Sequence, residues 1–223
     1  MDLDISENLK RIRFEIGEAE AKYRKPNDTV RIMAVTKTVD YKRINEAVKE
    51  GITLLGENRV QEYLDKRDFY DKSAEVHFIG HLQTNKVKYI ADSVTMIHSV
   101  DSARLAAEID RQAGRAGKML DVLLEVNIGG EDSKSGVSPE ELDGLLYETA
   151  QLENIMVRGL MTIPPIGESE RAFERMQRLF EDMKSRDSGF DTLSMGMSAD
   201  FALAVKYGSN IVRIGSRIFG ARK

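Results

Sequence analysis

The sequence predicts a single (β/α)8 barrel, the TIM-barrel fold of the α/β class, preceded by one extra N-terminal helix. Short apolar segments alternate with helical segments along the chain, and the alternation repeats eight times within 223 residues. Alternating strands and helices form right-handed βαβ units around a parallel sheet, and eight units in a chain of this length match a TIM barrel. An open doubly wound sheet is the alternative. It usually has a Gly-rich turn after the first strand, where this chain has TKTVDYK (36–42).

The first 25 residues predict an amphipathic helix, because apolar residues recur on one face at helical spacing. These residues are Leu3, Leu9, Ile12, Ile16 and Ala19. The turn-forming triplet Pro-Asn-Asp at 26–28 ends this helix. Because no low-complexity tract or long linker follows, we expect residues 1–223 to form one domain.

Eight short apolar segments bounded by turn residues then predict strands. They lie at residues 30–35, 53–56, 76–80, 95–99, 121–127, 155–161, 192–196 and 211–215. The segments between them predict helices at about residues 41–50, 57–69, 85–92, 102–117, 168–185 and 198–208. A further helix is expected to open at Ser138-Pro139-Glu140-Glu141, a capping box with proline at the first helical position.

The composition excludes several kinds of protein and site. Cysteine is absent, which excludes disulfides, thiol catalysis and thiolate-bound metals. The net charge is −4 with Lys and Arg spread along the chain, unlike the basic stripe of a nucleic-acid-binding protein. No apolar run approaches about 18 residues, and the charged N-terminus does not resemble a signal peptide. We expect a cytoplasmic protein that binds neither nucleic acid nor membrane. No exposed apolar seam is evident, so a monomer is expected.

Polar and unusual residues follow all eight predicted strands. In a TIM barrel the chemistry lies at the C-terminal ends of the strands. The residues found there are Lys37, Glu57 to Arg59, His81, His98, Asn127, Met161 and Thr162, Ser194 to Ser198, and Arg213, Gly215 and Ser216.

Lys37 is the most informative of these residues. Strand alternation places Met33, Val35 and Lys37 on one face, which directs the Lys37 ammonium over the barrel mouth. Partial removal from water there would free the amine to form a Schiff base with an aldehyde. Taken alone, a lysine at a strand end is more often a solvated charge.

The loops after the seventh and eighth strands have features of a phosphate site, and TIM barrels most often bind phosphate at these loops. MGMSAD (195–200) places Ser198 at the start of a helix, where free N–H groups and the helix dipole favour an anion. In RIGSRIFG (213–220), Gly215 allows close backbone approach and Ser216 offers a hydroxyl and an N–H. Either loop alone fits a plain cap or turn equally well, but the two together favour phosphate.

The remaining candidates have two interpretations each. Asn58 fits a hydrogen bond to a ring hydroxyl or a cap of the next helix. Arg213 fits contact with a pyridine nitrogen or with a carboxylate. The run from Ser194 to Met197 is by default barrel packing.

The three histidines are weaker signals. His77 lies within a predicted strand and is expected in the core, whereas His81 and His98 can reach the barrel mouth. No nearby carboxylate set accompanies them to indicate a metal site.

Eight ordered motifs resemble those of the pyridoxal phosphate homeostasis proteins. The family is also called the proline synthetase co-transcribed homologues, or alanine-racemase N-terminal-domain-like proteins. The motifs cover about residues 30–220, nearly the whole chain. They are AVTKT (34–38), GENRVQE (56–62), HFIGHLQTNK (77–86), IHSVDS (97–102), VNIGGEDSKSG (126–136), RGLMTI (158–163), LSMGMSADF (193–201) and RIGSRIFG (213–220).

This resemblance implies a fold-type III barrel with pyridoxal 5'-phosphate in Schiff-base linkage to Lys37. It also implies phosphate contacts from Ser198, Gly215 and Ser216. Arg217 after Ser216 departs from many relatives, which have Thr and then a small residue, but serine keeps the hydroxyl. The predicted cofactor site comprises Lys37, Asn58, His81, Met161, Ser194, Met197, Ser198, Arg213, Gly215 and Ser216.

Members of this family are usually regarded as buffering or delivering the cofactor without robust catalysis, with effects on amino-acid and keto-acid balance. We therefore expect a non-catalytic carrier, with apo forms of pyridoxal phosphate enzymes as recipients. The enzymatic alternative is a low-activity amino-acid racemase. Racemisation needs an acid/base group on each face of the substrate, and Lys37 supplies one. In true racemases the opposing tyrosine comes from a second, β-rich domain, and only RIFGARK (217–223) follows the eighth strand. A barrel that binds another phosphorylated metabolite without covalent chemistry is the third possibility.

Overall fold

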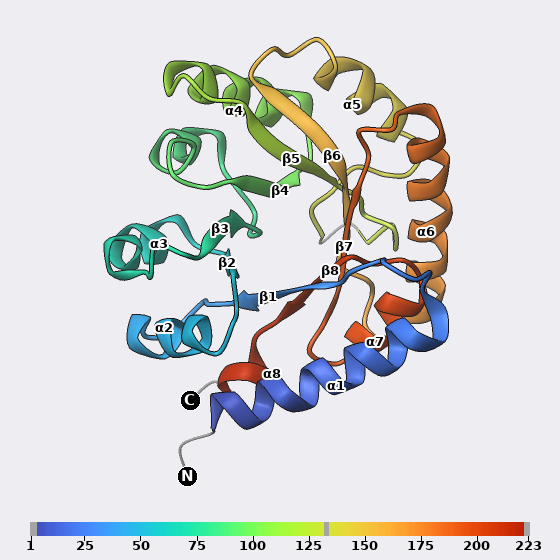
Figure 1. Ribbon diagram of the computed structural model, residues 1–223. Helices are drawn as coiled ribbons and strands as arrows, with labels where there is room; N and C mark the ends of the chain where they lie inside the picture. The colour runs from blue at the N-terminus through green and yellow to red at the C-terminus, as the bar shows by residue number, and fades with distance from the viewer. Residues whose placement is uncertain (1–3, 132–133, 221–223) are drawn as a thin grey trace.

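The computed structural model describes residues 4–131 and 134–220. Its strands form a closed barrel in the order β1 to β8, with β8 pairing in parallel with β1, and helices surround the strands (Figure 1). The predicted (β/α)8 barrel is therefore confirmed, and the open-sheet alternative is wrong. The prediction of one domain over residues 1–223 also includes residues 1–3, 132–133 and 221–223, which lie outside the described residues.

The strands are β1 (Arg31–Val35), β2 (Leu54–Glu57), β3 (Glu75–Phe78), β4 (Met96–Val100), β5 (Leu120–Glu125), β6 (Ile155–Met161), β7 (Thr192–Met197) and β8 (Ile211–Ile214). The α-helices are α1 (Ile5–Tyr23), α2 (Tyr41–Lys49), α3 (Val60–Lys66), α4 (Ala103–Arg115), α5 (Leu142–Thr149), α6 (Ser169–Arg186), α7 (Phe201–Lys206) and α8 (Ser216–Phe219). Two 3-10 helices are η1 (Arg67–Phe69) and η2 (Thr84–Tyr89). None of these helices is both long and apolar enough to cross a bilayer.

The helices predicted at 85–92 and after Ser138 differ from the structure. The segment expected as a helix at 85–92 is the 3-10 helix η2, with i→i+3 bonds such as Lys86 N–H to Gln83 O, 2.9 Å. The helix expected to open at Pro139 begins at Leu142. The Glu141 carboxylate does accept from the Ser138 N–H at 3.1 Å, but this contact closes a turn before the helix.

The strands have two apolar faces, because alternate residues of a strand point to opposite sides. The outer face packs under the helices in the main core, and it includes Leu120, Val122 and Leu124 of β5. The inner face holds two small clusters inside the barrel. One consists of Met33, Leu54, Ile79 and Ile211, and the other of Met96, Leu123 and Met161. The rest of the barrel interior is therefore left to polar side chains.

Helix α1 packs on the outside of the barrel beside α7 and α8, the helices on either side of β8 in the chain (Figure 1). Its predicted apolar face is buried at Leu9, Ile12, Ile16 and Ala19, with Ile5, whereas Leu3 lies outside the described residues. Two polar contacts reach α8. The Asn8 amide donates to Ile218 O at 3.0 Å, and Arg217 pairs with Glu15, Nη1 to Oε2 being 2.8 Å. The residue that departs from the family pattern, Arg217, thus ties α8 to α1.

The backbone of β6 requires glycine at position 159. Gly159 has φ +153°, and a Cβ there would lie 1.8 Å from the Thr192 carbonyl oxygen of β7. We predict that Gly159→Ala lowers the free energy of unfolding by about 3 kcal/mol, because it adds strain and separates two paired strands. Chemical denaturation followed by circular dichroism measures the change.

Gly17→Ala is the control for this prediction. Gly17 lies inside α1, and a Cβ added there would meet no neighbouring element or side chain within 4 Å among the described residues. Alanine at this position should therefore gain about 0.5–1 kcal/mol. Equal stability of Gly159→Ala and the wild type would contradict the prediction.

Candidate functional site

Lys37 lies in a tight turn at the end of β1. Met33 and Val35 pack inside the barrel, so strand alternation continues to the half-buried Lys37 at the barrel mouth. The turn is closed by Val39 N–H donating to Thr36 O at 3.1 Å. Thr38 has φ +62°, a conformation that costs a β-branched residue about 1–3 kcal/mol. The turn therefore requires support from neighbouring groups.

Arg213 of β8 lies fully inside the barrel, with 4% of its surface exposed. Its Nη1 donates to the carbonyl and the hydroxyl oxygens of Ser194, both at 2.8 Å, and Nη2 donates to Thr162 O at 2.8 Å. Burial lowers the pKa of Arg213 to about 10, against the opposing charges of Glu125 and Asp200, so the group stays cationic at neutral pH. Of its five N–H groups, those on Nε and one on Nη2 donate to none of the described residues.

A chain of hydrogen bonds continues from Ser194 through the barrel interior. His98 Nδ1 lies 3.1 Å from Ser194 Oγ, and His98 Nε2 lies 2.9 Å from His77 Nδ1. His77 Nε2 faces Glu75 Oε2 at 3.7 Å. Burial lowers the pKa of His77 to about 3, and burial lowers the pKa of His98 well below its ordinary value. Both imidazoles are therefore neutral at pH 7.

The direction of this chain follows from its two ends. Ser194 Oγ accepts from Arg213, so its own proton is available to His98 Nδ1. His98 then carries its proton on Nε2 and donates it to His77, whose Nε2–H faces the Glu75 carboxylate. The opposite order would place an unprotonated nitrogen against that carboxylate. His77 is thus a satisfied core residue, as predicted, whereas the expectation that His98 reaches the mouth is wrong, because it is fully buried between His77 and Ser194.

Glu125 is a site residue that the sequence pattern alone did not single out. It is the last residue of β5, at the inward parity of Leu123, and only 7% of its surface is exposed. Burial raises the pKa of Glu125 to about 7; the charge of Asp101 adds to this shift and Arg213 opposes it. A carboxyl directly after the apolar run Val122 to Leu124 was the available signal, since buried charges mark sites with a shifted pKa.

The two predicted phosphate loops meet at the barrel mouth. Gly215 N–H donates to Ser198 Oγ at 3.3 Å. A Cβ on Gly215 would lie 3.3 Å from Val35 O, so this glycine lets the loop rest against the end of β1, two residues before Lys37. At the start of α8, the N–H groups of Ser216 and Arg217 donate to none of the described residues. The loop therefore presents unused backbone donors beside the lysine turn.

Ser198 does not start a helix, so that prediction is wrong. Helix α7 begins at Phe201 after Asp200. The Asp200 carboxylate accepts from Met197 N–H at 2.7 Å, and Asp200 N–H donates to Met197 O at 3.0 Å. Asp side chains compete with helical bonding in this way, and the resulting turn carries Ser198 at its tip.

The remaining predicted residues divide into two groups. Met161, Ser194 and Met197 follow neighbouring strands, where Met161 pairs in register with Ser194 and Met197 with Arg213. Met161 packs inside the barrel with Met96 and Leu123. Of the three, Ser194 bonds directly to Arg213 and Met197 is its register partner. His81 and Asn58 lie instead on the rim.

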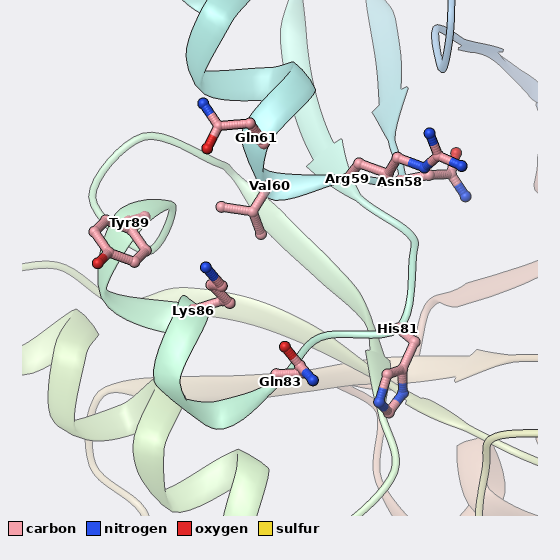
Figure 2. Close-up of a pocket in the computed structure, with 8 residues that line it drawn as sticks. All are labelled: Asn58, Arg59, Val60, Gln61, His81, Gln83, Lys86 and Tyr89. Atoms are coloured by element: carbon pink, nitrogen blue, oxygen red, sulfur yellow. The ribbon is translucent and has the colours of Figure 1, made fainter.

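A pocket of ≈ 480 Å³ opens on this rim, between the segment after β2 and helix η2 (Figure 2). It is lined by Asn58, Arg59, Val60, Gln61, His81, Gln83, Lys86 and Tyr89. The exposed His81 lies 3.2 Å from Ser135 Oγ, so it is turned to the loop after β5. Asn58 does not cap α3, and its buried Oδ1 accepts no hydrogen bond from the described residues.

Comparison with known proteins identifies close relatives over the full length. The family model described as "Alanine racemase, N-terminal domain" matches residues 8–223. The pyridoxal phosphate homeostasis protein of Aquifex aeolicus is 42% identical, over 99% of this chain and 100% of the relative. The protein of the same name from Escherichia coli K12 is 40% identical, over 98% of this chain and 97% of the relative.

Solved structures agree with this assignment. A protein of unknown function from Bifidobacterium adolescentis superposes with a TM-score of 0.91 at 34% identity, over 96% of this chain and 94% of that one. PipY of Synechococcus elongatus, solved with PLP bound, superposes with a TM-score of 0.84 at 31% identity, over 97% of this chain and 100% of that one. Alanine racemase of Clostridium difficile shares the fold, with a TM-score of 0.72 at 18% identity over 57% of its chain.

The raised pKa of Glu125 predicts a pH-dependent cost to stability. The folded protein binds the Glu125 proton more tightly than the unfolded chain does. The contribution of this proton to the free energy of unfolding is therefore complete below the ordinary pKa of 4.5, and it is lost as the pH rises through about 7. Glu125→Gln is uncharged throughout, and it should gain about 3 kcal/mol over the wild type at pH 8, but little at pH 4. Urea unfolding at the two pH values measures this difference.

The exposed Glu148→Gln on α5 is the control, and its effect should be the same at both pH values. A gain for Glu125→Gln that did not change between pH 4 and pH 8 would show that folding does not raise the pKa of Glu125.

Proposed function

Because the chain belongs to the pyridoxal phosphate homeostasis family, with its alanine racemase N-terminal barrel, we propose that it binds pyridoxal 5'-phosphate at the barrel mouth. Its role is intracellular homeostasis of this cofactor, by buffering and delivery, with effects on amino-acid and keto-acid balance. The observation that carries the proposal is the contact between Gly215 and the end of β1, which brings the phosphate loops beside the turn of Lys37.

The donor set at the mouth fits this cofactor. A phosphate requires several N–H and O–H donors, and the N–H groups of Ser216 and Arg217 with the Ser198 and Ser216 hydroxyls meet this need. Asn58 Oδ1 is a buried acceptor without a donor among the described residues, which suits a ring hydroxyl. Arg213 has N–H groups to spare for a ring nitrogen. Covalent attachment requires a primary amine, which Lys37 provides.

Each of these residues then has one task. Bound pyridoxal 5'-phosphate supplies an aldehyde carbon, to which the Lys37 amine bonds with loss of one water. Ser198, Gly215 and Ser216 hold the phosphate. Arg213 can only donate hydrogen bonds, so a ring nitrogen beside it would stay unprotonated and the ring would be a weak electron sink. Met161, Ser194 and Met197 keep Arg213 in place, and His81 lies on the rim.

The weak electron sink supports a carrier without efficient catalysis. Racemisation depends on a stabilised carbanion, and an arginine beside the ring nitrogen works against it. We propose that the protein acts as a monomer in the cytoplasm, as one barrel domain over residues 1–223, and that apo forms of pyridoxal phosphate enzymes receive the cofactor. The racemase alternative predicts Lys37-dependent turnover of alanine enantiomers.

The proposal predicts covalent capture of pyridoxal 5'-phosphate at Lys37. Wild-type protein mixed with the cofactor and reduced with borohydride should carry one adduct, located at Lys37 by peptide mass spectrometry, because reduction makes the bond permanent. Lys37→Ala should lose the adduct, and Lys42→Ala, on the exposed side of α2, should keep it. A wild type without an adduct, or with adducts spread over surface lysines, would overturn the proposed function. Turnover of D- or L-alanine that Lys37→Ala abolishes would favour the racemase.

A further inference from the structure

The GENRVQE motif contributes only Asn58 to the proposed cofactor site. Its two glutamates, Glu57 and Glu62, belong to β2 and α3. Glu57 is on the outward parity of β2, since Leu54 packs inside the barrel and Leu55 packs under the helices. Neither glutamate is directed to the barrel interior, but both reach the residues next to Lys37.

Glu57 holds the residue before Lys37. Thr36 is fully buried, and its hydroxyl lies 2.6 Å from Glu57 Oε1. Its N–H donates to Gly56 O at 3.1 Å. Its carbonyl oxygen accepts from Val39 N–H at 3.1 Å and from Lys66 Nζ at 3.0 Å. All polar groups of Thr36 are thus engaged, which fixes the residue on one side of the lysine.

Glu62 holds the residue after Lys37. Thr38 N–H donates to Glu62 Oε2 at 2.8 Å, and this bond holds Thr38 in its left-handed conformation. The pKa of Glu62 lies below its ordinary value: burial raises it, and the Thr38 N–H and the charges of Lys66 and Arg59 outweigh that effect. The carboxylate is therefore ionised at neutral pH, as a strong acceptor requires.

Lys66 contacts both glutamates and so links them into one cluster. Its ammonium lies 3.2 Å from Glu57 Oε1 and 3.9 Å from Glu62 Oε2, and only 14% of its side chain is exposed. The Tyr70 hydroxyl donates to the same Glu57 oxygen from the far side. Two carboxylates and one ammonium, largely removed from water, thus lie beside the turn from Thr36 to Val39, which carries Lys37.

We propose that Glu57 and Glu62 are positioning residues for cofactor capture, because they fix Thr36 and Thr38 and so set where the Lys37 amine meets the aldehyde. This inference rests on the proposed function. The clamp formed by Glu57 and Glu62 acts on the covalent step alone, because the phosphate loops lie on the β8 side of β1 and the two glutamates lie on its β2 side. A change in the clamp should therefore slow capture without weakening phosphate binding.

The test uses Glu62, since removal of the fully buried Glu57 would leave Lys66 and Tyr70 unpaired inside the protein. Glu62→Ala should slow covalent capture of pyridoxal 5'-phosphate at Lys37 about tenfold, as misplacement of a reacting group by a fraction of an ångström does. Affinity for pyridoxamine 5'-phosphate should not change, because this analogue has the phosphate but no aldehyde. Glu62→Gln should recover most of the capture rate, because its amide oxygen still accepts from Thr38 N–H.

Glu108→Ala is the matched control. Glu108 is 20% exposed and pairs with Arg111 one turn later, whereas Glu62 is 24% exposed and pairs with Arg59 one turn earlier. Capture in Glu108→Ala should equal the wild type. Unchanged capture in Glu62→Ala would overturn the positioning role, as would an equal loss of pyridoxamine 5'-phosphate affinity. Absence of capture in the wild type would instead overturn the proposed function.

Discussion

The buried guanidinium of Arg213 determines how the interior of this barrel is built. A charge removed from water is costly unless protein groups replace its hydration. Here the carbonyl oxygens of Thr162 and Ser194 and the Ser194 hydroxyl do so, and they connect the end of β6 and the middle of β7 to a side chain of β8. Because β6 and β7 supply the groups that replace water around Arg213, the position of this side chain depends on how β6, β7 and β8 pack together.

The other interior groups adapt to that charge. A protonated histidine beside Arg213 would repel it, and burial keeps both His98 and His77 neutral. The neutral imidazoles still form a chain of hydrogen bonds that all point the same way. Ser194 donates to His98, His98 donates to His77, and the His77 N–H faces Glu75. Glu125 attracts Arg213 yet is repelled by Asp101 and poorly hydrated, so it holds its proton near neutral pH. The polar interior is therefore organised around the permanent positive charge of Arg213.

Local pattern was sufficient to predict the barrel, the placement of Lys37 and the polar residues at the strand ends. Each depends on alternation or on position within one element. The contacts between elements were not accessible in this way. His98 meets Ser194 across 96 residues of chain, and its orientation depends on how β4 faces β7, which no local window contains. Ser198 was misplaced because the Asp200 carboxylate closes a turn where a helix start was expected. Whether the predicted residues touch the cofactor stays a prediction.

The two neighbours of β1, strands β8 and β2, bring different groups to the barrel mouth. On one side β1 pairs with β8, with Ala34 opposite Ile214, and Gly215 rests against Val35. On the other it pairs with β2, with Val35 opposite Gly56, and Glu57 reaches Thr36. The distance between the phosphate loops and the lysine turn is thus set by two strand registers, which are rigid. The conformation of the turn itself is fixed separately, by the buried Glu57 and the partly exposed Glu62. This arrangement suits the proposed carrier role, because a firm phosphate cradle would retain the cofactor while a turn that water can reach would allow the covalent bond to be made and broken.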